Sequence, residues 1–185
     1  MNYILFDSDV RKALLPLTYT RPVADIRIGV LTIREKWEKH LGYTTSTLTE
    51  EYLEKRYPMV EMAENIMINA SFCPTESLVK IIRNLKKNEA IFKDEDVIAF
   101  YTTEKQKAVD FSTYKAIEFD EDIIQVKNTW DIFSKNENAI QEDFALITSG
   151  RTSQPIPTTV NVINPENIFI EEGAQLTFAT LNATT

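Results

Sequence analysis

The stretch NYILFDSDVRKALLPLTYTRPVADIRIGVLTIREKW, residues 2–37, decides the fold class, because it passes from a strand through a polar loop into a helix. Its first five residues, NYILF, form a short apolar run that ends at Asp7, as a buried strand does. Residues 29–41 have apolar side chains at helical spacing, and Gly42 is a stop signal. The apolar positions of this predicted helix are Val30, Ile33, Trp37 and Leu41.

The same alternation of strand and helix continues along the chain. Strands are expected at 44–48, 66–70, 89–94, 96–103 and within 115–128, and helices at 51–57, 75–88 and 129–147. This order predicts an α/β domain with a mainly parallel sheet. Ligands of such sheets bind beyond the carboxyl ends of the strands. We therefore expect the functional site in the loops that follow Phe6 and Ala70.

The last predicted helix, residues 129–147, has a cap and an apolar face in its sequence. Thr129 is the expected N-cap, since a threonine side chain accepts a hydrogen bond from the first turn. The apolar stripe that would face the core consists of Trp130, Phe133, Ile140 and Phe144.

Composition bounds the class of protein. The 185 residues are 43% hydrophobic and 26% charged, as in a globular domain, and the net charge is −8. An acidic chain is not expected to bind nucleic acid or an anionic membrane surface. The single cysteine, Cys73, excludes an internal disulfide and fits a reducing cytoplasm, and we expect it to be a buried thiol.

The C-terminal part differs in character from the rest. Residues 151–166 form a proline-bearing connector, and in 167–185 the residues Ile170, Leu176 and Leu181 are spaced by six and five. This spacing is similar to one coil of a hexapeptide β-helix, and an ordinary terminal hairpin is the alternative. A single coil cannot bury its own face, so we expect a longer natural chain or a partner that covers the end.

Three arginines, Arg21, Arg27 and Arg34, follow the first strand closely in an acidic chain. Arginine guanidinium groups suit phosphate recognition, so Arg21 and Arg27 are candidates for binding a phosphate. We expect Arg34 on a solvated helix face. The alternative is that Asp25 pairs with one of the arginines, in which case the cluster is structural.

Residues 4–37, together with MINAS at 67–71 and the start of hexapeptide repeats after NIFIEEGA at 167–174, resemble a known family. It is the variant bacterial sugar-nucleotidyltransferase family, described as UDP-N-acetylglucosamine diphosphorylase and glucosamine-1-phosphate N-acetyltransferase-like proteins. The resemblance implies a Rossmann-like nucleotidyltransferase domain over 1–150, and a left-handed parallel β-helix that begins at 167.

The resemblance also implies a reaction. A nucleoside triphosphate and a sugar 1-phosphate, of N-acetylglucosamine type, give a nucleotide sugar and pyrophosphate with magnesium as cofactor. It further implies a homo-oligomer assembled through the β-helix. The longer natural chain is expected to be an acyltransferase as well, whereas this chain, whose tail has no histidine, is expected to lack acetyltransferase activity.

The family motifs match this sequence unevenly. Residues 16–18 supply the PLT motif, and 20–22 are similar to the segment that leads into a Pro-Lys pair, but Val23 stands in place of the lysine. The glycine-rich loop is replaced by DSDVRKA, residues 7–13, which has no glycine. The contact of the missing lysine is either absent or taken by Arg27.

The resemblance implies Arg11, Thr18, Thr20 and Asn69 for substrate binding. The charge of phosphate chemistry favours Arg21 and Arg27 for catalysis, and Asp7 and Asp9 are candidate oxygen ligands for magnesium. Asn69 replaces a metal-binding aspartate, and the alternative is that it bonds its own turn backbone. The missing glycines and acid leave a second function open. That function is a non-catalytic nucleotide- or sugar-binding, or regulatory, domain attached to a β-helix acyltransferase, and a scaffold for β-helix assembly is a third.

Overall fold

The computed structural model describes residues 1–103 and 109–184, and the chain divides into two compact units, Met1–Asp143 and Phe144–Thr185. Each unit is treated by itself below. No helix in the described ranges is long and apolar enough to cross a bilayer. The predicted boundaries at 150 and 166 stay predictions.

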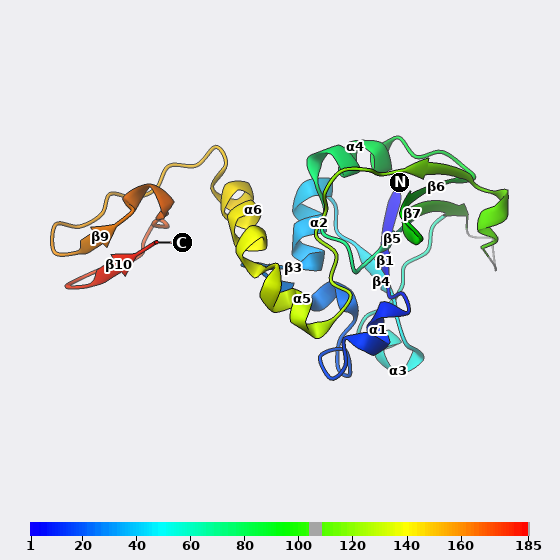
Figure 1. Ribbon diagram of the computed structural model, residues 1–185, viewed down its shortest axis with the longest axis horizontal. Helices are drawn as coiled ribbons and strands as arrows, with labels where there is room; N and C mark the ends of the chain where they lie inside the picture. The colour runs from blue at the N-terminus through cyan, green and yellow to red at the C-terminus, as the bar shows by residue number, and fades with distance from the viewer. Residues whose placement is uncertain (104–108, 185) are drawn as a thin grey trace. The chain divides into compact units, whose positions relative to one another are not determined.

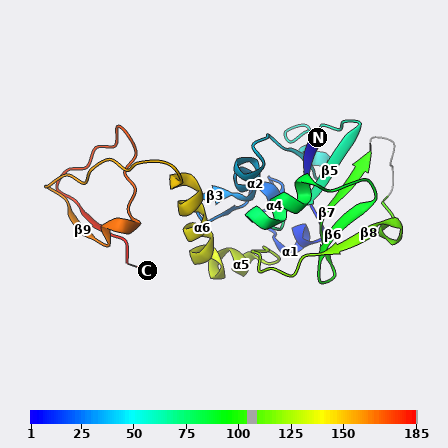
Figure 2. The ribbon, with the colours of Figure 1, turned by 90° about the horizontal axis from the view of Figure 1, so that it is seen from above.

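The first unit is built around a six-stranded sheet in the order β4-β1-β5-β7-β6-β8 (Figures 1 and 2). β1 pairs in parallel with β4 and β5, β6 pairs in parallel with β8, and β7 is antiparallel to both of its neighbours. The predicted mainly parallel sheet is therefore confirmed. The strands are β1 (Asn2–Phe6), β4 (Ser46–Leu48), β5 (Glu64–Asn69), β6 (Glu89–Lys93), β7 (Asp96–Thr103) and β8 (Lys115–Glu118).

Helices α2 (Ile33–Leu41) and α4 (Glu76–Arg83) cover one face of this sheet, where the larger core cluster lies (Figure 1). Trp37 is fully buried there, as expected, and its indole nitrogen donates a hydrogen bond to the Phe72 carbonyl at 2.8 Å. Thr75 caps α4 as predicted, since its hydroxyl accepts from the Leu78 amide. Burial of such apolar faces is the main source of stability of the domain.

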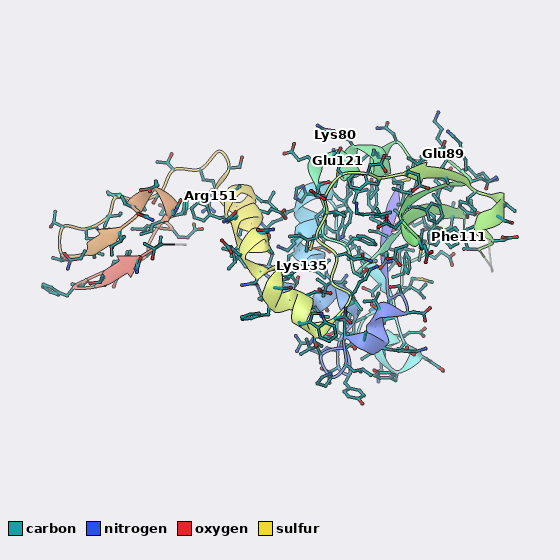
Figure 3. The ribbon with its side chains drawn as sticks, viewed as in Figure 1. Lys80, Glu89, Phe111, Glu121, Lys135 and Arg151 are labelled. Atoms are coloured by element: carbon teal, nitrogen blue, oxygen red, sulfur yellow. The ribbon has the colours of Figure 1, made fainter. Side chains whose placement is uncertain are left out.

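The opposite face of the sheet carries a second, mainly aromatic cluster. Ile4, Met67 and Phe100 from the strands pack with Phe111 and Tyr114, which the short 3-10 helix η2 (Phe111–Thr113) and the residue after it supply. The Phe100 and Phe111 rings meet edge-to-face with centroids 5.2 Å apart, a favoured aromatic geometry. Figure 3 labels Phe111 at this end of the sheet.

The predicted helix at 29–41 begins later than expected. The antiparallel strands β2 (Arg27–Ile28) and β3 (Leu31–Thr32) form a tight hairpin first, and α2 starts at Ile33. Gly29 makes the turn possible, because its φ of +75° is strained for other residues and an added Cβ would lie 2.5 Å from a carboxylate oxygen of Asp143. Gly42 ends α2 in the left-handed conformation, as predicted.

The predicted helix at 129–147 is two helices, α5 (Thr129–Ser134) and α6 (Asn136–Thr148), separated at Lys135 (Figure 3). Asn128, not Thr129, is the N-cap, and its backbone amide donates a hydrogen bond to the Asp131 carboxylate at 2.8 Å. The predicted core stripe is wrong, because Trp130 and Phe133 are 66% and 87% exposed and Ile140 is also exposed. The break at Lys135 shifts the phase of the apolar positions from one helix to the next.

The second unit contains the parallel strands β9 (Asn161–Ile163) and β10 (Thr180–Asn182), and the 3-10 helix η3 (Pro165–Asn167) lies between them in sequence. A parallel pair requires a crossover, so these strands are not a terminal hairpin. The Arg151 guanidinium is salt-bridged to Glu171 and lies 4.9 Å from the centre of the Phe169 ring. One pair of short strands does not make a β-helix, and the predicted coil stays a prediction.

Candidate functional site

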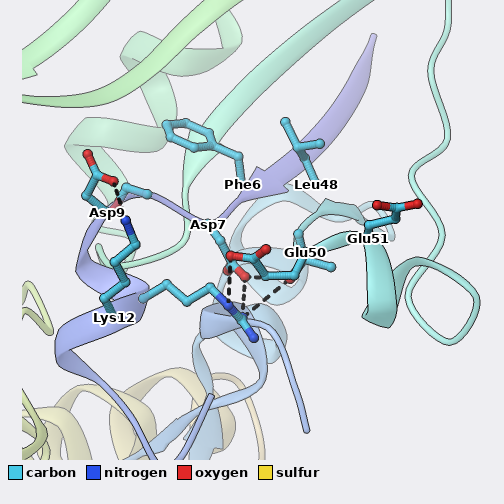
Figure 4. A pocket seen from close by; sticks show the side chains of 10 residues that line it. Phe6, Asp7, Asp9, Lys12, Leu48, Glu50 and Glu51 are labelled. Carbon is cyan, nitrogen blue, oxygen red and sulfur yellow. Dashed lines mark hydrogen bonds and ion pairs between the residues drawn. The ribbon is translucent and has the colours of Figure 1, made fainter. Parts of the chain in front are cut away.

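The carboxyl ends of β1 and β4 meet at one edge of the sheet and are followed there by two loops and the short helices α1 (Val10–Ala13) and α3 (Glu51–Glu54). A cavity of about 540 Å³ lies at this edge, and we call it the edge cavity (Figure 4). This is where the topology of the sheet predicts a ligand. The cavity is lined by Phe6, Asp7, Ser8, Asp9, Arg11, Lys12, Leu48, Thr49, Glu50 and Glu51.

Asp7 is held firmly by the protein itself. Its carboxylate accepts hydrogen bonds from the Arg11 guanidinium at 2.6 Å, from the Thr49 hydroxyl at 2.6 Å and from the Val23 amide at 2.8 Å. The side chains of Asp7 and Arg11 are only 5% and 7% exposed. These contacts tie the end of β1 to the end of β4 and to the loop that carries Arg21.

Arg11 is the centre of this network. Besides Asp7, its guanidinium donates to the Thr18 and Arg21 carbonyls and to the Tyr52 hydroxyl, and it lies 3.7 Å from Glu50. Thr18 is fully buried, and its hydroxyl donates to the Arg11 carbonyl at 2.9 Å. Two of the four predicted substrate-binding side chains, Arg11 and Thr18, are thus engaged in contacts within the protein, and both position residues 7–21.

The two predicted magnesium ligands do not converge. Asp9 is fully exposed and its only ion-pair partner in the described ranges is Lys12 at 4.0 Å, while both oxygens of Asp7 already accept hydrogen bonds. Among the described residues, no three His, Cys, Asp or Glu side chains gather closely enough to hold a metal ion by themselves. This donor set does not fit a resident magnesium ion, which needs oxygen ligands with near-octahedral geometry.

Asn69, at the end of β5, is buried, and both ends of its side-chain amide form hydrogen bonds within the protein. Its side-chain oxygen accepts from the Ser71 amide at 3.1 Å and from the Ser71 hydroxyl at 2.9 Å, and its amide donates to the Val97 carbonyl. These are the contacts of the alternative interpretation, in which the side chain bonds its own turn. Its predicted role in substrate binding stays a prediction.

A second cavity, of about 490 Å³, brings together three arginines, and we call it the arginine pocket. Arg21 and Thr20, two predicted site residues, line it. Arg34 also lines it and is not the solvated side chain expected from the sequence, since its side chain is 19% exposed. The pocket is lined by Thr20, Arg21, Asp25, Thr32, Arg34, Glu35, Arg56 and Tyr57.

Arg34 is fixed on all sides of its guanidinium. It donates to the Asp25 carboxylate at 2.6 Å, to the Thr45 carbonyl and hydroxyl at 3.2 Å, and to the Thr47 hydroxyl. Asp25 therefore pairs with an arginine, as one of the two sequence interpretations expected. Arg34 is a rigid wall of the pocket that ties α2 to β4.

Glu35, the other acid of the pocket, is occupied by a helix cap. Its carboxylate accepts from the Thr32 amide at 2.7 Å, and the Thr32 hydroxyl accepts from the Glu35 amide in turn. The Thr32 hydrogen bond lowers the pKa of Glu35, and nearby Arg27 and Lys39 lower it further against the effect of burial. Arg27, a predicted catalytic residue, lies 3.8 Å from Glu35, donates to the Val30 carbonyl and lines neither cavity.

Sequence reasoning missed several residues that organise this region. Lys36 and Asp143 form a buried ion pair, and Asp143 also accepts from the Val30 and Leu31 amides, which fixes the β2–β3 hairpin. Arg56 was not singled out, because it lies after a short helix and far from Arg21 in sequence. Thr32 and Glu35 could have been found, since T-x-x-E is the capping-box signal.

The single cysteine is not part of either cavity. Burial raises the pKa of the Cys73 thiol to about 12, so it stays protonated at neutral pH and is not a nucleophile. The expectation of a buried, inert thiol is confirmed.

Comparison with known families gives a match over most of the chain. The family model described as sugar nucleotidyl transferase matches residues 3–152, which include the sheet, both cavities and α6. A search of curated proteins found no match.

Proposed function

Because the chain belongs to the sugar nucleotidyl transferase family, we propose that it is a sugar-1-phosphate nucleotidyltransferase domain of N-acetylglucosamine type. The observation that carries the proposal is the family match across residues 3–152. The substrates are a nucleoside triphosphate and a sugar 1-phosphate. The finer assignment, to the uridine nucleotide of N-acetylglucosamine, rests on the resemblance of residues 4–37.

In this reaction an oxygen of the sugar 1-phosphate attacks the α-phosphorus of the triphosphate, and the bond to the β-phosphate oxygen breaks to release pyrophosphate. Catalysis of such transfers is mainly positioning and stabilisation of phosphate charge. We assign the charge stabilisation to Arg21, which lines the arginine pocket next to Thr20. Arg27 is kept as a second candidate, which would have to leave Glu35 to reach a phosphate.

Arg11 and Thr18 act on the substrate indirectly in this proposal. The Arg11 guanidinium holds the Arg21 carbonyl at 3.2 Å, so the buried network sets the position of the Arg21 backbone. Magnesium enters the proposal with the triphosphate, since this ion is typically bound by substrate phosphates and only one or two carboxylates. Asp9 is the more accessible of the two predicted carboxylates.

One observation favours a second function, a nucleotide- or sugar-binding regulatory domain without turnover. The loop after β1 has Asp7-Ser8-Asp9 where glycines would let backbone amides approach phosphates, and Asp7 is locked by Arg11. Such a loop is expected in a domain that binds the substrates but lacks the phosphate contacts needed for turnover. In either function, the parallel β9–β10 pair is compatible with the start of a β-helix through which chains assemble.

The test is an assay of pyrophosphate release from UTP and N-acetylglucosamine 1-phosphate, with and without magnesium, beside calorimetric titration of each substrate. We expect magnesium-dependent release and a loss of kcat of at least about tenfold for Arg21→Ala, because a transition-state contact to phosphate is removed. Lys55→Ala, an exposed charge outside both cavities, is the control and should keep full activity. Binding of both substrates without release would favour the regulatory function, and absence of binding would refute both.

A further inference from the structure

We infer that the arginine pocket binds a phosphate-bearing ligand and that Arg56, on the segment after α3, is one of the residues that binds it. Arg56 lies outside every motif that the sequence analysis used. The inference relies on the proposed function only for the identity of the ligand, a phosphate of a substrate or of the pyrophosphate product. The binding of a phosphate group as such follows from the charges of the pocket.

Both acids of the pocket are already engaged with other groups. Asp25 is paired with Arg34 at 2.6 Å, and Glu35 is bound into the cap of α2. Neither carboxylate is therefore free to neutralise the remaining cations. Because Arg34 is mostly buried and held by Asp25, Thr45 and Thr47, it fixes the wall against which those cations lie.

The two other arginines have guanidinium groups that no acid neutralises. Within the described ranges, no carboxylate lies within ion-pair distance of Arg21 or Arg56, although the chain has a net charge of −8. Arg56 lies over the Tyr57 ring, with 5.6 Å between the guanidinium carbon and the ring centre. This stacking restrains Arg56 without using its hydrogen-bond donors.

The size and chemistry of the pocket suit a small anion. Its volume of about 490 Å³ lies within the range of ligand sites. A guanidinium fork binds phosphate with two parallel, charge-assisted hydrogen bonds, and Arg21 and Arg56 offer two such forks. A ligand with two linked phosphate groups can engage both, so we expect pyrophosphate to bind more tightly than orthophosphate.

The experiment is calorimetric titration of the whole chain with pyrophosphate, orthophosphate, N-acetylglucosamine 1-phosphate and UTP at about 0.15 M salt, where non-specific attraction is screened. We expect saturable pyrophosphate binding that Arg56→Ala and Arg21→Ala each weaken by at least about tenfold. Arg56→Lys should lose less than Arg56→Ala, since it keeps the charge but not the fork. Lys55→Ala, which removes an adjacent exposed charge outside the pocket, should bind within about twofold of the wild type.

The inference is overturned if both arginine variants bind pyrophosphate as well as the wild type, or if Lys55→Ala weakens binding as much as Arg56→Ala. Arg56 and Arg21 are exposed, so their variants should fold, and unchanged melting temperatures will confirm it. The result is separable from the proposed function. Arginine-dependent binding of pyrophosphate without turnover would refute the proposed enzymatic function and support the phosphate site in the arginine pocket. Turnover and pyrophosphate binding that are both unaffected by Arg56→Ala would support the enzymatic function and refute the phosphate site.

Discussion

The edge cavity and the arginine pocket have similar volumes and are lined by neighbouring parts of the chain. They differ in whether the protein itself pairs their arginines with acids. In the edge cavity the key cation, Arg11, is buried and paired with Asp7. In the arginine pocket, Arg21 and Arg56 have no acid partner among the residues described, and only Arg34 is paired. A charge that the protein already satisfies supports the fold, whereas a charge left open to solvent in a concave site is available to a ligand.

The difference has a physical cause. Burial of a guanidinium without a partner is costly, so Arg11 must be matched by Asp7 and by carbonyl groups. Arg21 and Arg56 keep contact with water and need no such compensation. The comparison therefore predicts that charge removal affects stability in the first cavity and ligand binding in the second.

The largest effect on stability is expected from Arg11→Ala. This change leaves the buried Asp7 carboxylate without its cation and the Thr18 and Arg21 carbonyls without a donor, and should lower the free energy of unfolding by about 3–5 kcal/mol. Urea denaturation measures it. Lys12→Ala, a change of an exposed neighbour, should stay within about 0.5 kcal/mol of the wild type. If Arg11→Ala lowered the free energy of unfolding only slightly, the proposed contrast between a structural arginine in the edge cavity and ligand-binding arginines in the arginine pocket would be wrong.

An intermediate effect is expected from Arg34→Ala, because Arg34 is paired with an acid, as Arg11 is, but lines the arginine pocket. It removes hydrogen bonds to Thr45 and Thr47, and it leaves Asp25 unpaired but partly solvated, so we expect a loss of about 1–2 kcal/mol. The freed Asp25 carboxylate would also repel an anion, so pyrophosphate binding should weaken. Lys39→Ala, an exposed cation of the same helix, is the control for both measurements. Unchanged pyrophosphate binding in Arg34→Ala would contradict the assignment of Asp25 to Arg34.

The fold could be read from the sequence wherever one periodicity dominated. The apolar runs at 2–6 and 66–70 gave buried strands, and Thr75 and Gly42 gave helix ends, because these signals are local. The sequence does not predict the hairpin before α2, because Gly29-Val30 fits a helical pattern, although the T-x-x-E signal at Thr32 places the start of the helix later. Trp130 and Phe133 were assigned to the core because a pattern cannot show the break at Lys135.

The location of the candidate site could be predicted from the sequence, but the ion pairs and hydrogen bonds of its arginines could not. The loop after β1 does lie at a cavity, as parallel-sheet topology requires. Which arginine is buried and which is free depends on contacts distant in sequence, such as Arg11 with Tyr52 and Arg34 with Thr47. The same reason explains why Arg56 was not singled out, since no motif connects it with Arg21.

The smallest effect is expected from Glu35→Gln, which tests whether the charge of Glu35 stabilises the cap of α2. Its folded-state pKa is lowered, chiefly by the Thr32 amide, so the ionised form contributes stability above its ordinary pKa of 4.5 and loses it as pH falls through the folded-state value. Glutamine keeps the capping hydrogen bond but loses the charge near Arg27 and the helix N-terminus, so about 0.5 kcal/mol should be lost at pH 7. Urea denaturation of both proteins at pH 7 and at successively lower pH measures the difference, which should shrink as the pH falls through the folded-state pKa of Glu35. A difference that persists below the folded-state pKa would show that the charge of Glu35 is not what stabilises the cap.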